Sequence, residues 1–108
     1  MRKIESLMNA AIANGKDWRS GNTAVTHRET ILGTVAEVRL HGNLISMVSE
    51  NRITLYDGGW RSNTTKSRLN AVLRANGLPG DSVFQRNHEW FISYDGNTEP
   101  FESGAMLG

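Results

Sequence analysis

Residues 33–56 read GTVAEVRLHGNLISMVSENRITLY, and this stretch decides the fold. Apolar and polar residues alternate through Thr34 to Leu40, which is the period of a strand with one buried face. His41-Gly42-Asn43 supplies a tight turn, because glycine and asparagine tolerate a positive φ. Leu44 to Ser49 and Ile53 to Tyr56 then supply two further strands. The stretch therefore predicts an antiparallel β-meander.

A helix is predicted on each side of this meander. The first runs from Arg2 to Asn14, ends at Gly15, and carries one apolar stripe made of Ile4, Leu7, Met8, Ala11 and Ile12. The second follows a cap at Ser62, Asn63 or Thr64 and buries Leu69, Val72 and Leu73. Each helix has a single apolar stripe to bury, so we expect an α+β fold in which both helices pack on one face of an antiparallel sheet.

The remaining segments complete a single domain. Val83-Phe84 and Trp90 to Tyr94 predict two short strands. We expect the domain to span residues 1–96, and residues 97–108 to form a loop or flexible tail because they lack periodicity. The sheet face without helices is predicted to be partly exposed and apolar, and Ile45, Met47 and Phe91 are expected either to lie on it or to form a small second core. Such a face predicts pairing with a second copy of the chain.

Composition excludes several classes of function. The 108 residues contain no cysteine, which removes disulfides, thiolate nucleophiles and cysteine-rich zinc sites. No apolar run approaches the ~20 residues of a membrane-spanning helix, so the expected location is the cytoplasm. The glycine-rich segments at Asp57-Gly58-Gly59 and Asn76 to Gly80 match neither a phosphate-binding loop nor a dinucleotide fingerprint. We expect no cofactor and no metal.

The histidines carry the enzyme hypothesis. General acid–base chemistry needs a histidine within hydrogen-bond reach of its substrate and of an orienting partner. His41 and His88 both lie at predicted turns and could meet at one end of the sheet, but no spacing motif indicates that they do. Solvent-exposed turn residues are the favoured interpretation, and we expect a protein that is not an enzyme.

Two similar phrases contain two of the three tryptophans: Trp18-Arg19-Ser20 and Trp60-Arg61-Ser62. Tryptophan and arginine are enriched at interface hot spots. Trp60 directly precedes a helix cap, which predicts that its indole packs on that helix. Trp18 has no such structural explanation, so Trp18 and Arg19 are the predicted protein-binding residues.

The second helix and its approach are basic. Residues 58–80 carry four cations and no acid, whereas residues 87–108 carry four acids and no lysine or arginine. The alternative function is therefore nucleic-acid binding, with phosphate contacts and base stacking from Trp60, Arg61, Lys66, Arg68 and Arg74. A net charge of only +1 argues against a dedicated nucleic-acid binder.

Four segments resemble small accessory proteins encoded by tailed bacteriophages. They are Leu40 to Ile45, Gly59 to Leu73, Val83 to Arg86, and Trp90-Phe91. The resemblance implies expression inside an infected bacterium and brings no catalytic residues with it. Together with the residue patterns, it leads to the expectation of a stoichiometric binding module for a host or phage macromolecule, with a host or phage protein as the expected partner.

Overall fold

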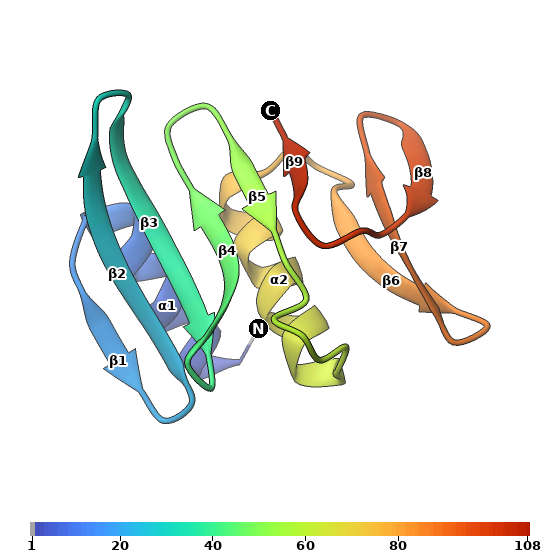
Figure 1. Cartoon of the computed structure of the whole chain (residues 1–108), viewed down its shortest axis with the longest axis horizontal. Coiled ribbons are helices and arrows are strands. Elements are labelled where there is room, and N and C mark those ends of the chain that lie inside the picture. The colour runs from blue at the N-terminus through green and yellow to red at the C-terminus, as the bar shows by residue number, and fades with distance from the viewer. Residues whose placement is uncertain (1) are drawn as a thin grey trace.

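The computed structural model describes residues 2–108, which contain two helices and nine strands (Figure 1). The helices are α1 (Lys3–Asn14) and α2 (Asn63–Asn76). The strands are β1 (Trp18–Ser20), β2 (Thr23–Thr30), β3 (Gly33–Leu40), β4 (Asn43–Val48), β5 (Ile53–Leu55), β6 (Ser82–Arg86), β7 (Glu89–Tyr94), β8 (Asn97–Pro100) and β9 (Ala105–Leu107). The predicted α+β class is confirmed.

The meander forms the centre of a six-stranded antiparallel sheet, in the order β1-β2-β3-β4-β5-β9. Val25 lies opposite Val38, and Ala36 lies opposite Val48, so one face of the sheet is continuously apolar. A β-bulge interrupts the β3–β4 register after Val38. Ile45 is the extra residue of this bulge, and its side chain points inward, where it is fully buried. The alternative in which Ile45 lies on the uncovered face is therefore wrong.

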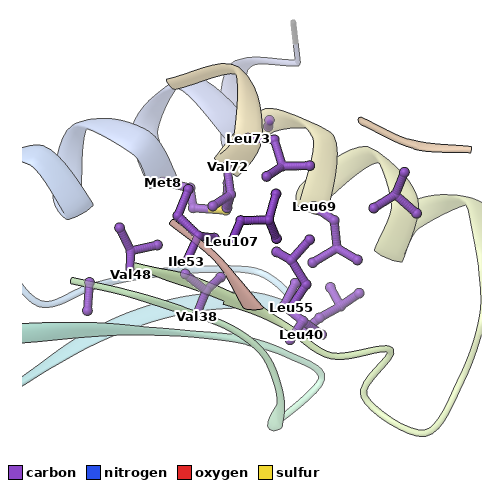
Figure 2. Packing of buried hydrophobic residues seen from close by; sticks show 14 of the residues in the cluster. Met8, Val38, Leu40, Val48, Ile53, Leu55, Leu69, Val72, Leu73 and Leu107 are labelled. Atoms are coloured by element: carbon purple, nitrogen blue, oxygen red, sulfur yellow. The ribbon is translucent and has the colours of Figure 1, made fainter. Parts of the chain in front are cut away.

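Both helices cover the apolar face of this sheet, as predicted (Figure 1). Figure 2 shows Leu69, Val72 and Leu73 of α2 above the side chains of the sheet. Helix α1 contributes Met8 and Ala11, whereas Leu7 of the predicted stripe is 43% exposed. The stripe is rotated because Glu5 is buried and takes part in a polar network between the helices.

This network centres on an ion pair between Glu5 and Arg68 of α2, with 2.8 Å between Oε2 and Nη1. Both side chains are 4% exposed. Arg68 also donates to Thr23 Oγ1 and Asn22 Oδ1, and the Ser67 hydroxyl donates to Glu5 Oε2. A buried guanidinium is tolerated because its donors have partners. The network fixes both helices against the start of β2.

A smaller sheet, in the order β6-β7-β8, packs beside α2. Asn70 on the helix joins the two by a pair of hydrogen bonds to the backbone of Val83, at 2.8 and 2.7 Å. The Asn70 side-chain amide thus both donates to and accepts from the Val83 backbone, as the backbone of a neighbouring strand would. Phe91 belongs to this sheet, where its ring stacks on Phe84 at 5.7 Å between centroids, and not to the uncovered face of the larger sheet.

The last twelve residues are folded, which corrects the expectation of a loop or flexible tail. Strand β8 pairs with β7, and β9 pairs with β5 at the edge of the larger sheet. Phe101, which follows β8, and Leu107, the last residue of β9, are both buried in the core. These strands have three or four residues, too few to show the periodicity by which strands are recognised in a sequence.

Candidate binding site

The segment from β5 to α2 forms a tightly held loop at residues 56–62. Gly58 and Gly59 adopt φ values of 68° and 83°, which only glycine takes without strain. The Asp57 carboxylate accepts a hydrogen bond from Gly59 N–H at 2.8 Å, and Trp60 N–H donates to Asp57 O at 3.2 Å. At the far end, Ser62 caps α2 by accepting from Thr65 N–H at 3.1 Å. The loop is therefore fixed at both ends.

The Arg61 side chain lies along the surface of the protein, 42% exposed, and contacts the loop and the smaller sheet. Its Nε donates to Asp57 Oδ2 at 3.2 Å, and Nη2 donates to Phe101 O at 3.1 Å. The guanidinium carbon lies 5.6 Å and 5.5 Å from the ring centroids of Trp90 and Phe101, within the range of cation–π attraction. Arg61 thus joins the loop to the smaller sheet and to the C-terminal segment.

The hydrogen bonds within this loop and to Arg61 also change the pKa of the Asp57 carboxyl. Partial burial raises its pKa, but the Gly59 N–H, the Arg61 guanidinium and the Ser103 hydroxyl together outweigh burial and hold the pKa below its ordinary value. Asp57 is thus ionised at neutral pH and available as the acceptor that holds the loop.

Trp60 turns outward and is 76% exposed. The prediction that its indole packs on α2 is therefore wrong. It borders a cavity of about 310 Å³ lined by Leu40, His41, Asn43, Ile45, Asp57, Gly58, Ser62, Thr64 and Thr65. The name Trp60 surface is used below for Trp60 and this cavity. A large exposed aromatic side chain on a rigid backbone loses little entropy on binding, which is favourable for recognition.

The other predicted protein-binding pair is divided between two faces. Trp18 lies opposite Val25 in the strand register and packs against the core, partly buried. Arg19, the next residue along β1, points to the opposite side of the sheet and is exposed. Trp18 and Arg19 therefore do not form one contact surface.

The cations of the predicted nucleic-acid surface are also dispersed. Arg68 is buried against Glu5, and Arg61 is engaged by Asp57 and Phe101. Lys66 donates to Gln85 at 2.9 Å, with its ammonium 5.8 Å from the Trp90 ring centroid. Arg74 is exposed near the C-terminal end of α2. Trp60 therefore lies next to Arg61, which is 42% exposed but engaged by Asp57 and Phe101, and not within a cluster of unengaged cations.

One family model matches the chain over residues 1–108, and its description is Kyanoviridae Gp96 protein. The chain belongs to this family. The Kyanoviridae are tailed phages of cyanobacteria, so the resemblance to proteins of tailed bacteriophages is confirmed. Comparisons with curated proteins and with solved structures found no match for this Kyanoviridae Gp96 family member.

The histidines of this Gp96 family member lie apart. His41 lines the cavity beside Trp60, at the β3–β4 turn. His88 lies at the β6–β7 turn, on the far side of α2 from the β3–β4 turn in Figure 1. The pair that the enzyme hypothesis required is not formed. His27, the third histidine, lies 3.1 Å from the carboxylate of Asp17 through Nδ1.

Residues 2–108 of this Gp96 family member contain no group of three or more histidine, aspartate or glutamate side chains that could hold a metal ion. No helix in the same range is long and apolar enough to cross a membrane.

Proposed function

We propose that this protein is a stoichiometric binding module that uses the Trp60 surface to contact a host or phage protein in the cytoplasm of the infected cell. The observation that carries the proposal is the exposure of Trp60 on a loop whose backbone is held at Asp57 and at Ser62. Exposure of the apolar indole to water does not stabilise the unliganded protein. Tryptophan is also among the residues that most often dominate binding energy.

The surroundings of Trp60 favour a protein partner. The cavity beside it combines apolar walls at Leu40 and Ile45 with polar groups at Asn43 and Thr64. A pocket with these two components suits one inserted side chain of a partner. Nucleic-acid binding, the alternative, requires cations placed along a phosphate backbone. Arg61 and Arg68 are instead committed to contacts within the protein.

The test begins with affinity purification of the tagged full-length chain from infected cells. Any partner recovered is then purified and titrated by calorimetry. We expect a stoichiometry of one partner per chain and a loss of affinity of about 30-fold or more for Trp60→Ala, the size of a hot-spot truncation. Leu78→Ala is the matched control, because Leu78 is a 68% exposed apolar residue outside the Trp60 surface.

Thermal unfolding separates binding from folding, since truncation of an exposed side chain leaves stability nearly unchanged. Equal affinity of Trp60→Ala and the wild-type chain for the partner would overturn the proposal. So would salt-dependent binding of single-stranded nucleic acid that is lost in Trp60→Ala, because that result selects the alternative.

A further inference from the structure

Five strand pairs of the described chain are joined by two-residue hairpin turns. Their tips are Gly21-Asn22, Ile31-Leu32, His41-Gly42, Asn87-His88 and Asp95-Gly96. Four of them carry glycine, asparagine, aspartate or histidine, the polar or flexible residues that turns require. The β2–β3 tip instead presents two large aliphatic side chains, with Ile31 102% and Leu32 92% exposed.

The turn does not need these two side chains. Thr30 holds it by accepting from Leu32 N–H at 3.1 Å and donating its hydroxyl to Gly33 O at 2.7 Å. Gly33, at φ 112°, supplies the unusual backbone angle. Local structure therefore leaves the choice of isoleucine and leucine unexplained, although their exposure to water is unfavourable.

A large hollow lies beside the tip on the uncovered face of the six-stranded sheet, the face that Figure 1 presents to the viewer. Its volume is about 640 Å³, twice that of the cavity at Trp60. Its apolar lining comes from Val35, Met47, Tyr56 and Met106, and Ile31 and Leu32 of the tip border it. Methionine side chains adapt to the shape of an inserted group, so this lining suits aliphatic side chains.

The border of the hollow carries charges of both signs. Arg28 and Arg52 lie on it together with Glu50. A surface with one dominant sign selects a partner of the opposite sign, whereas a mixed border can pair with its own copy. The molecule measures 37 and 29 Å along its two longest axes, so a standard interface of about 800 Å² per partner would extend over most of this side of it.

We propose that a second copy of this chain covers the hollow, and that each copy inserts Ile31 and Leu32 into the hollow of the other. A two-fold axis in the plane of contact, between tip and hollow, makes the two insertions equivalent. The tip and the hollow lie on one face, which this arrangement requires. The proposal is independent of the function assigned to Trp60, because the two surfaces share no lining residue.

The test is sedimentation equilibrium of the full-length chain over about 1 to 100 μM, where an interface of standard size is populated. We expect the wild-type chain to dimerise. The double substitution Ile31→Asn and Leu32→Gly installs ordinary turn residues and retains the fold. It removes four inserted side chains per dimer and weakens dimerisation by about 10,000-fold, since each buried aliphatic side chain contributes roughly tenfold. Leu78→Ser, at an exposed leucine elsewhere, leaves dimerisation unchanged.

A mixing experiment tests the reciprocal geometry. Met106→Glu places a charge in the hollow and prevents insertion there, because Met106 is 60% exposed and lines it. The tip variant changes Ile31 and Leu32 at the edge of its own hollow but keeps the lining from Val35, Met47, Tyr56 and Met106, and the Met106→Glu variant keeps an intact tip. Native mass spectrometry of the mixture should therefore show heterodimers in excess of either homodimer.

Three outcomes would overturn the proposal. The first is a monomer throughout the concentration range. The second is a dimer that the tip substitutions do not weaken. The third is a monomer that binds vesicles of zwitterionic and anionic phospholipid through Ile31 and Leu32, because the tip is then a membrane contact.

Discussion

Removal of the Glu5 carboxylate is expected to be the most damaging single change to this fold outside its apolar core. Glu5→Ala leaves the Arg68 guanidinium with 4% exposure and without its counter-charge. The Ser67 hydroxyl loses its acceptor in the same step. Breaking a buried pair by removing one partner costs about 3–5 kcal/mol, because the remaining charge is neither paired nor hydrated.

That cost is large relative to the total free energy of unfolding. A domain of this size has a free energy of unfolding of about 5–15 kcal/mol, so Glu5→Ala removes about a fifth of it or more. The midpoint of thermal unfolding should fall by about 15 °C or more. Urea titration followed by circular dichroism measures the free energy directly, with Glu102→Ala as a control at an exposed glutamate, expected within about 0.5 kcal/mol of the wild-type chain.

A double-mutant cycle separates the pair from the cost of the orphaned charge. Glu5→Leu combined with Arg68→Met removes both charges at similar volume and should restore stability to the wild-type value or above it. Thr23 and Asn22 retain their mutual hydrogen bond at 2.8 Å when the arginine is absent. A Glu5→Ala cost below about 1 kcal/mol, or a double variant no more stable than Glu5→Ala alone, would refute the reasoning.

Two further predictions concern the C-terminal segment and the Trp60 loop. Phe101→Ala should lower the free energy of unfolding, measured by urea titration, by about 3–5 kcal/mol, because Phe101 is buried against Trp90 and Arg61. A cost near zero would mean that residues 97–108 add little to the stability of the fold. The pKa of Asp57 is lowered from 3.8, so the stabilisation that its carboxylate gives the loop is fully present above pH 3.8 and is lost as the pH falls through the lower, folded-state pKa. The chemical shift of the Gly59 amide proton, followed by NMR, should report this loss. Asp57→Asn should abolish the pH dependence of that shift.

Local patterns predicted the elements of this fold well. The alternation in residues 34–40 predicted β3, and Ser62 was among the three residues expected to cap α2. Both signals act over a few neighbouring residues, so they are visible in the sequence itself. The predicted packing of both helices on one face followed from their single apolar stripes.

Long-range pairing could not be predicted in this way. Strand β9 joins the sheet because Leu107 meets Ile53, a partner 54 residues earlier in the chain. The contact between Glu5 and Arg68 spans 63 residues. Glu5 is a polar residue beside the apolar Ile4 and Met8, and only the position of a distant cation explains its burial. No local period carries that information.

The repeated Trp-Arg-Ser phrase shows how context decides the role of a side chain. In β1 the alternation of a strand turns Trp18 toward the core and Arg19 toward solvent. In the loop before α2, Asp57 and the rings of Trp90 and Phe101 hold the Arg61 guanidinium against the protein, although the side chain stays 42% exposed. Trp60 is 76% exposed. The same three residues therefore give a packing contact at one position and a candidate binding surface at the other.

The two proposed surfaces have a joint consequence. Ile31-Leu32 and His41 lie at opposite ends of β3, which is eight residues long, so the proposed dimer contact and the Trp60 surface are separated by roughly 25 Å. Dimerisation on the uncovered face thus leaves both Trp60 surfaces accessible. A bivalent particle gains apparent affinity for an oligomeric partner through effective concentration, without any new contact. If the tip substitutions weaken binding to an oligomeric partner while the 1:1 affinity for its monomeric form stays unchanged, the dimer acts through avidity and Trp60 through direct contact.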